Sequence, residues 1–194
     1  MALPPLAAAD KAALLRYARQ VIRHALLGGA PPAAPAATSA LAEPCGAFVT
    51  LTVEGALRGC IGNLVGDRPL VETIREMALA AAFHDPRFPA LSAQELRLVR
   101  LEISVLSPME LVDDPRQVQV GHHGLVISRG PARGVLLPQV ASHYGWDRVT
   151  FLGQTCRKAG LPPDAWMKKG TLIQAFTAEI FSEAEIDHDL CVKP

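Results

Sequence analysis

The first recurring pattern of apolar and polar positions predicts an amphipathic helix over residues 7–27. Apolar side chains return there every three or four residues, and the arginines fall outside that stripe. Gly28 and Gly29 end the pattern. Residues 28–44 are rich in proline and alanine, which bury little surface, so we expect a surface connection there.

A different period begins at residue 47. In AFVTLTVEGALRGCIG, two alternating runs are separated by Glu54-Gly55, and this combination predicts a hairpin of two strands. On the return strand Arg58 and Cys60 are two residues apart. We therefore expect their side chains to share a face of the hairpin, about 7 Å apart along the strand.

The hairpin is followed by a helical pattern that starts near residue 70 and is stopped by Pro86 and Pro89. A long alternating strand then covers residues 98–105. The same order returns about 75 residues later, in GLVISRGPARGVLLP, WDRVTFLGQTCRKAG and TLIQAFTAEIFSE. Arg133-Gly134 matches Arg58-Gly59, and Val135 takes the place of Cys60. The sequence thus predicts a duplicated hairpin–helix–strand unit.

Composition bounds the class of protein. The 194 residues are 49% hydrophobic and 20% charged with zero formal net charge, which is typical of a folded globular chain. The missing basic excess argues weakly against nucleic acid binding, without excluding a local basic patch. No apolar run spans a bilayer and the N-terminus lacks a basic leader, so we expect a cytoplasmic protein without a membrane partner. Four cysteines without a CxxC pair predict free thiols.

Cys60 is the first candidate for chemistry. Arg58 on the same face and the N-terminus of the following helix would both stabilise a thiolate. Gly59 and Gly62 would leave backbone N–H groups open to a ligand. The competing interpretation is a buried strand cysteine, since free cysteine is among the most buried residue types. A nucleophilic cysteine also needs a base, and the neighbouring sequence supplies none.

The segment FHDPRFPAL is the second candidate. His84 could be a general base and Arg87 an anion clamp near Cys60. Equally, His84 and Asp85 could simply end the helix, with Arg87 in a surface ion pair. No metal or other cofactor is expected, because the adjacent His122 and His123 would point to opposite faces of a strand and neither HxxxH nor a phosphate-binding glycine loop occurs.

The motifs CGAFVTL, LRGCIGNL, AAAFHDPRFPAL, EISVLSP, RGVLLPQVA and TCRKAGLPPDAW occur in one order between Leu14 and Phe181. In this the chain resembles the AmmeMemoRadiSam system protein A family, which has an AMMECR-type domain. The resemblance implies an α+β fold, in which two related β-hairpin/α/β units share one mixed, mainly antiparallel sheet and form two lobes with a cleft at RGCIG.

The resemblance also implies one domain over residues 1–194. Within it we expect the N-terminal helix at 7–27, the connection at 28–44, the first β/α unit at 45–112, the second at 113–183 and a tail at 184–194. The matching positions form three blocks: Arg58, Gly59, Cys60, Ile61 and Gly62 in the first, Asp85, Arg87, Phe88 and Pro89 in the second, Pro138 and Gln139 in the third. Asn63 departs from the aromatic or threonine that is common at its position.

Two hypotheses for function follow. In the first, the protein is an enzyme or enzyme-accessory subunit acting on a small molecule; its catalytic residues would be Cys60, Arg58, His84 and Asp85, and its substrate-binding residues Gly59, Gly62, Arg87 and Gln139. In the second, it is a binding module without chemistry, in which Cys60 is structural. For both, the resemblance implies a Memo-like protein, related to non-haem-iron extradiol dioxygenases, and a radical SAM protein as partners. A third hypothesis, a nucleic acid regulator, needs a basic face that zero net charge does not predict.

Overall fold

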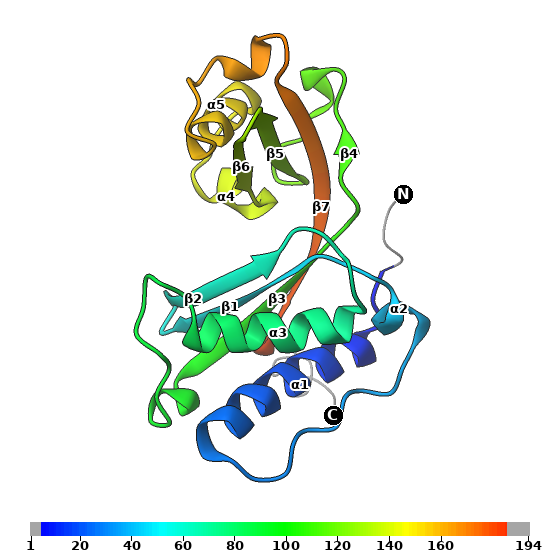
Figure 1. Cartoon of the computed structure of the whole chain (residues 1–194), viewed down its shortest axis with the longest axis vertical. Helices are drawn as coiled ribbons and strands as arrows, with labels where there is room; N and C mark the ends of the chain where they lie inside the picture. The colour runs from blue at the N-terminus through cyan, green and yellow to red at the C-terminus, as the bar shows by residue number, and fades with distance from the viewer. Residues whose placement is uncertain (1–4, 186–194) are drawn as a thin grey trace. The chain divides into compact units, whose positions relative to one another are not determined.

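The structure is a computed structural model that describes residues 5–185 (Figure 1). Most of the expected tail at 184–194, including Cys191, lies outside the described residues. Contacts divide the described chain into two units. We call residues 5–106 together with 179–185 the cysteine unit, and residues 107–178 the pocket unit.

The cysteine unit places two helices on one face of a sheet (Figure 1). Its middle strand β1 pairs with β2 on one side and β3 on the other, both antiparallel. Helices α1 and α3 pack against each other and cover the apolar face of these strands, which carries Val49, Leu51 and Leu101. The elements of this unit are α1 (Ala8–Leu27), α2 (Ser39–Ala42), β1 (Ala47–Val53), β2 (Ala56–Asn63), α3 (Leu70–Phe83), the 3₁₀ turn η1 (Glu95–Arg97) and β3 (Val99–Leu106).

The hairpin predicted from residue 47 onwards is confirmed. Glu54 and Gly55 both have positive φ, 51° and 81°, which is the geometry of a two-residue hairpin turn that matches strand twist. The pairing is irregular further on: Leu51 lies opposite Gly59 but Thr52 lies opposite Leu57. Arg58 is therefore an extra residue, a β-bulge, on β2.

In the pocket unit β5 pairs antiparallel with β6 and with β7, and β4 also pairs with β7. Helix α5 packs on β5 and β6, and its Phe151 and Cys156 are fully buried there. The elements of this unit are β4 (Glu110–Leu111), η2 (Pro115–Gln117), β5 (His123–Arg129), β6 (Ala132–Leu136), α4 (Pro138–His143), α5 (Arg148–Lys158), η3 (Ala165–Met167) and β7 (Leu172–Ser182).

Strand β7 continues beyond residue 178, so its last residues belong to the cysteine unit, where they join β3. The strand order is β2-β1-β3-β7-β5-β6, and every pairing with a described register is antiparallel. The predicted α+β class with a mainly antiparallel sheet is confirmed. No helix within residues 5–185 is long and apolar enough to cross a membrane.

Two glycines at equivalent positions support the predicted duplication. A Cβ on Gly59 of β2 would lie 2.2 Å from the carbonyl oxygen of Ala81 in α3. A Cβ on Gly134 of β6 would lie 2.3 Å from the backbone nitrogen of Ala159, directly after α5. In both units, then, a glycine on the second hairpin strand lets a later helix, α3 or α5, approach the sheet closely.

Candidate functional site

The site begins with the thiol of Cys60. Cys60 on β2 lies directly opposite Thr50 on β1, and the Thr50 hydroxyl donates a hydrogen bond to Cys60 Sγ, with an oxygen–sulfur distance of 3.2 Å. Cys60 is partly exposed, whereas Cys45 and Cys156 are buried, and burial raises the pKa of both of those thiols. Of the three cysteines that the structure describes, Cys60 is thus the accessible one.

The backbone of Cys60 is held from outside the sheet. Since β2 is an edge strand, its outward N–H and C=O groups have no neighbouring strand to pair with. The Cys60 N–H donates to Asp85 Oδ2 at 2.8 Å, and Arg87 Nη2 donates to the Cys60 carbonyl oxygen at 3.1 Å. Asp85 and Arg87 together provide the acceptor and the donor that a further strand would have provided.

Both carboxylate oxygens of Asp85 accept hydrogen bonds. Besides the Cys60 N–H, its carboxylate accepts the backbone N–H of Arg87 at 3.1 Å and two guanidinium N–H groups of Arg87 at 2.9 and 2.7 Å. Its side chain is only 2% exposed. The hydrogen bonds from Arg87 hold the pKa of Asp85 well below its usual range, in spite of burial. A carboxylate bound in this way is a poor proton acceptor, so the geometry favours a positioning role for Asp85.

A second Asp-Pro-Arg tripeptide shows which part of this arrangement is local. Asp114 likewise accepts the backbone N–H of Arg116 at 2.9 Å and its guanidinium N–H at 2.9 Å. There, however, the two side chains are 36% and 86% exposed and bind no strand edge. The aspartate–arginine pairing thus follows from the tripeptide, whereas the burial of Asp85 and its bond to Cys60 follow from the fold.

Arg58 is bound to the segment that follows α3. Its guanidinium donates to both carboxylate oxygens of Glu95, at 2.7 and 3.2 Å, and to the carbonyl oxygen of Pro89 at 3.0 Å. The ring of Phe88 lies near two guanidinium groups, with its centroid 5.9 Å from Arg58 Cζ and 5.6 Å from Arg87 Cζ. Cation–π contacts of this kind add to the attachment of the segment.

The pairing with Glu95 bears on the expected role of Arg58. Hydrogen bonds from Arg58, followed by those from Ser92, lower the pKa of Glu95 to about 2. The Arg58 guanidinium, which we expected to stabilise a thiolate at Cys60, is thus ion-paired with Glu95. Stabilisation of Cys60 by Arg58 stays a prediction.

The expected helix N-terminus beside Cys60 is replaced by a helix C-terminus beside Gly59. Ala81, whose carbonyl approaches Gly59, lies in the last turn of α3. The N-terminus of α3 is eleven residues earlier, about 16 Å along the helix axis. The argument from the helix dipole was therefore wrong, because dipole effects fade within a turn.

The other candidates lie as follows. His84 is the exposed C-cap of α3, and within residues 5–185 its ring makes no hydrogen bond or ion pair. Gly62 lies under the ring of Phe48, which would be 2.2 Å from a Cβ. Gln139 is in α4 of the pocket unit, where its Oε1 is buried and accepts no hydrogen bond from the described residues. The roles expected for His84, Gly62 and Gln139 stay predictions.

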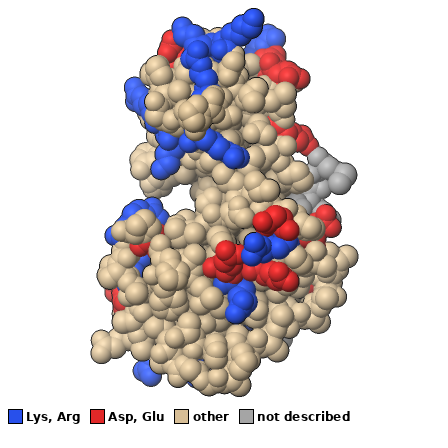
Figure 2. Space-filling view, in the orientation of Figure 1, with Lys and Arg blue, Asp and Glu red and all other residues tan. Residues whose placement is uncertain are grey.

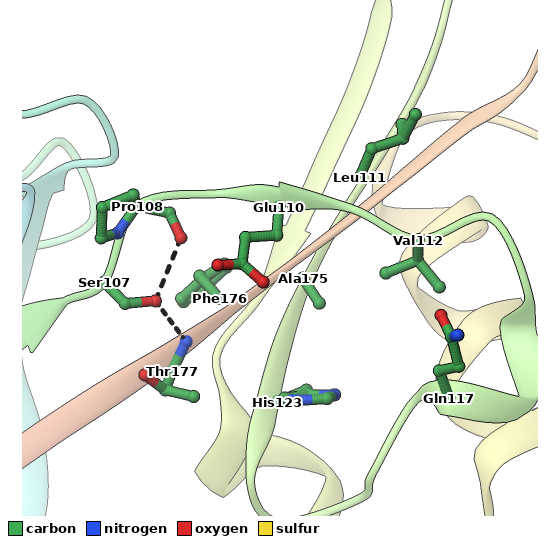
Figure 3. Close-up of a pocket in the computed structure, with 10 residues that line it drawn as sticks. All are labelled: Ser107, Pro108, Glu110, Leu111, Val112, Gln117, His123, Ala175, Phe176 and Thr177. Atoms are coloured by element: carbon green, nitrogen blue, oxygen red, sulfur yellow. Dashed lines mark hydrogen bonds between the residues drawn. The ribbon is translucent and has the colours of Figure 1, made fainter. Parts of the chain in front are cut away.

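The pocket unit contains a cavity of about 230 Å³ beside β4 and β7 (Figure 3). The Ser107 hydroxyl in its wall accepts the Thr177 N–H at 2.9 Å and donates to the Pro108 carbonyl at 3.1 Å. His123 lines the cavity, and its Nδ1 accepts the backbone N–H of Gln119 at 3.2 Å. Burial lowers the pKa of His123, which favours the neutral ring. Among the described residues no cluster suited to a metal ion occurs.

Charged side chains of both signs appear on the face in Figure 2. Residues 107–178 contain eight Lys and Arg and five Asp and Glu. Several of these charges are paired locally, as Lys168 is with Asp164 at 2.9 Å. This is a modest basic excess confined to one unit.

The comparisons with known proteins decide the family. The AMMECR1 family profile matches residues 15–181. The chain belongs to the AMMECR1 family. Similar AMMECR1-type relatives include protein TK0174 of Thermococcus kodakarensis, 44% identical over 184 residues and 88% of each chain, and protein PF1979 of Pyrococcus furiosus, 42% identical over 181 residues, 88% of this chain and 86% of its own.

The crystal structure of the uncharacterized protein PH0010 from Pyrococcus horikoshii is also similar. It shares 41% sequence identity with this chain and superimposes with a TM-score of 0.80 over 88% of this chain and 89% of its own. The AMMECR1 match includes both hairpins, the Asp85–Arg87 segment and Gln139. Every candidate residue chosen from the sequence therefore lies inside the AMMECR1 domain.

Sequence reasoning missed Thr50, which contacts Cys60, Glu95, which binds Arg58, and Glu102, which lies opposite Thr50 on β3. Thr50 is polar at an alternating position of β1, so its face could be predicted, but its partner could not. A two-residue turn at Glu54-Gly55 without a bulge would pair Thr50 with Gly59. No signal in the sequence marks the extra residue at Arg58.

Proposed function

We propose that this AMMECR1 protein is an enzyme, or a subunit that assists one, and that it acts on a small molecule through the thiol of Cys60. The hydrogen bond from Thr50 to Sγ of a partly exposed cysteine carries the proposal. The hydrogen bond holds Sγ beside the Thr50 hydroxyl, and the thiolate is the nucleophilic form of cysteine. Cys60 would be the nucleophile or the covalent acceptor.

The surroundings of Cys60 support a positioned nucleophile. Asp85 and Arg87 fix its backbone N–H and C=O, so Sγ is presented from a constrained strand. Positioning of this kind lowers the entropic cost of reaction. We include in the proposal a substrate cleft at the RGCIG segment, which the family resemblance implies, and proton handling by His84, which the sequence suggests.

We also propose that the protein works with a Memo-like protein and a radical SAM protein in the cytoplasm. This part rests on the family resemblance alone. Such partners would supply metal-dependent or radical chemistry, and the role of this chain would be to bind or to carry a small molecule.

The test is alkylation of the folded protein with iodoacetamide at pH 7, followed by peptide mass spectrometry. Cys60 should react at least about tenfold faster than Cys45 and Cys156, which are buried controls in the same chain. Thr50→Val should slow the reaction of Cys60, since the hydrogen bond is lost. Thr52→Val removes a hydroxyl from the same face of β1 and should leave the rate unchanged.

A Cys60 that reacts only after unfolding would overturn the proposal. Equal alkylation rates of Cys60 in Thr50→Val and Thr52→Val would mean that the hydrogen bond from Thr50 does not activate the thiol, and the proposal would lose its support. Circular dichroism of each variant shows whether the fold is retained.

A second candidate function is binding of a partner protein, favoured by the surface of α5. Two hollows of about 510 and 430 Å³ share Val149 and Trp166 in their walls. Val149 and Met167 are 61% and 62% exposed. Three arginines and two aspartates line these hollows: Arg116, Arg148, Arg157, Asp147 and Asp164. Exposed apolar side chains bordered by more arginine than aspartate suit an acidic segment that carries apolar residues.

Val149→Glu tests this candidate with a purified Memo-like protein as the probe. Isothermal titration calorimetry should show weaker binding than for the unchanged chain, while alkylation of Cys60 is unaffected. Val65→Glu, at a 56% exposed residue of the cysteine unit, is the control. Binding that neither variant weakens would exclude the α5 surface as the interface.

A further inference from the structure

Three polar side chains form a row across the cysteine unit. Thr50 of β1 has Cys60 of β2 as its partner on one side and Glu102 of β3 on the other. Directly opposite residues of antiparallel strands project from the same face of a sheet. This face is turned away from α1 and α3, because the alternate residues Leu51 and Leu101 are buried in the core beneath those helices.

No contact with the described residues assigns the Glu102 carboxyl group a role in stabilising the fold. Its side chain is partly buried, yet its carboxyl group makes no hydrogen bond or ion pair in the part of the chain that the structure describes. Asp85 and Glu95 of the same unit accept several hydrogen bonds each. Carboxyl groups that lose water without gaining partners cost stability, and such groups are concentrated at functional sites.

The environment of Glu102 favours its protonated form. Burial raises the pKa of Glu102, and the nearby carboxylate of Glu185 raises it further. Among the described residues whose pairing with β1 is known, the other ionisable groups on this face are Cys60 across the row and Arg100, two residues earlier on β3. β1 adds only uncharged side chains to the face. A carboxylic acid that keeps its proton closer to neutral pH is suited to proton donation.

We propose that Glu102 is the general acid of the Cys60 site. This inference rests on the proposed function, whose nucleophile it requires. Two strand spacings separate β2 from β3, about 9.6 Å between backbones. A molecule of a few heavy atoms lying over Thr50 would have Sγ at one end and the carboxyl group of Glu102 at the other.

This arrangement selects a class of substrate. The thiolate of Cys60, whose proton has gone to water, forms a bond to an electrophilic carbon. The electron pair of the breaking carbon–oxygen bond moves to oxygen, and that oxygen takes the proton of Glu102. The Glu102 carboxylate then regains a proton from water, so no oxidant or reductant is consumed. Small carbonyl compounds and epoxides react in this way, because their oxygen must be protonated.

Two probes of one thiol separate nucleophilicity from proton donation. Iodoacetamide releases iodide, which needs no proton, whereas ring opening of 1,2-epoxybutane leaves an oxygen that does. We expect Glu102→Gln to lower the ratio of the epoxide rate to the iodoacetamide rate at Cys60 by at least about tenfold. General acid catalysis contributes about a hundredfold or more, so a tenfold loss is a conservative threshold. Rates are measured by peptide mass spectrometry, relative to N-acetylcysteine.

The pH dependence adds a readout that a purely structural role would not change. In the unchanged protein the ratio should fall as pH rises through the titration of Glu102, since only the protonated acid donates. In Glu102→Gln the ratio should be independent of pH. Glu54→Gln changes the same chemical group in the hairpin turn, outside the row, and is the matched control. Slow alkylation of Cys45 and Cys156 verifies that each variant is folded.

The outcomes are distinct. If Cys60 reacts with iodoacetamide but the ratio is the same in Glu102→Gln and Glu54→Gln, this inference is wrong and the proposed function stands. If Cys60 fails to react with iodoacetamide in the folded protein, the proposed function is wrong, and the inference falls with it.

Discussion

The Asp85 carboxylate accepts the backbone N–H of Cys60 at 2.8 Å, across the free edge of β2. Cys60 and Asp85 are 25 residues apart in the sequence, and their hydrogen bond joins the motifs RGCIG and DPRFP in one structural element. Edge strands need protection against unwanted pairing, and the buried Asp85 carboxylate and the half-exposed Arg87 give that protection by binding the backbone of β2. The DPRFP motif therefore has a structural role, which is to hold the backbone of the RGCIG strand in place.

Replacing Asp85 should destabilise the protein strongly. Asp85→Asn removes the negative charge of the buried carboxylate but leaves its partner, the Arg87 guanidinium, in place. Breaking an ion pair in this way lowers the free energy of unfolding by about 2–4 kcal/mol. The free energy of unfolding from urea titration at pH 7 measures this. Asp114→Asn, in the exposed tripeptide of the same sequence, should cause a much smaller change. Equal losses in the two variants would mean that the edge contact contributes little.

Hydrogen exchange should locate the same effect at one amide. In the unchanged protein the Cys60 N–H is protected although it faces outward from an edge strand, because Asp85 accepts it. Asp85→Ala should speed exchange at Cys60 by about tenfold or more, with little change at Leu51 in the middle strand β1. NMR exchange rates at these two amides provide the measurement. Parallel acceleration at both would indicate general destabilisation in place of local opening.

The contribution of Glu95 to stability should depend on pH. The pKa of Glu95 is lowered to about 2 by Arg58 and Ser92, from an ordinary value near 4.5. A lowered folded-state pKa means that the stabilisation is complete above about 4.5 and is lost as pH falls towards 2. The difference in melting temperature between the unchanged protein and Glu95→Gln should therefore shrink over that interval.

A double variant isolates the pair. In an Arg58→Met background the same Glu95→Gln comparison should show a weaker pH dependence, since the main cause of the shift is gone. A pH dependence that persists unchanged without Arg58 would assign the shift to the Ser92 contacts.

Much of the fold follows from short-range patterns. The alternation of residues 47–53 predicted β1 and its faces, and Glu54-Gly55 predicted the turn, because both signals are local. Helix α3 was predicted from its apolar spacing and the prolines after it. The family resemblance implied one shared, mainly antiparallel sheet, but neither it nor the local patterns predicted the strand order β2-β1-β3-β7-β5-β6.

The site was less predictable because it depends on one bulge. A regular hairpin with this turn would pair Cys60 with Val49, on the face beneath the helices. The extra residue at Arg58 shifts the register by one, which moves Cys60 to the opposite face beside Thr50. The partners of Arg58 and Asp85 come from long-range packing of the segment after α3, and spacing within β2 carries no information about them.

The glycine pair offers a test of the duplication that is independent of Cys60. Gly59→Ala and Gly134→Ala should each cost about 2–3 kcal/mol of unfolding free energy, because the added Cβ meets helix backbone at 2.2 and 2.3 Å and neither element can yield without repacking. Gly130→Ala is the control: its φ is 57°, but its Cβ would meet nothing within 4 Å, so only the cost of a left-handed residue, about 1 kcal/mol, is expected. Urea titration of the three variants gives the comparison. If either Gly59→Ala or Gly134→Ala costs no more than Gly130→Ala, close helix approach is not a shared requirement of the two units, and the structural argument for their common origin is lost.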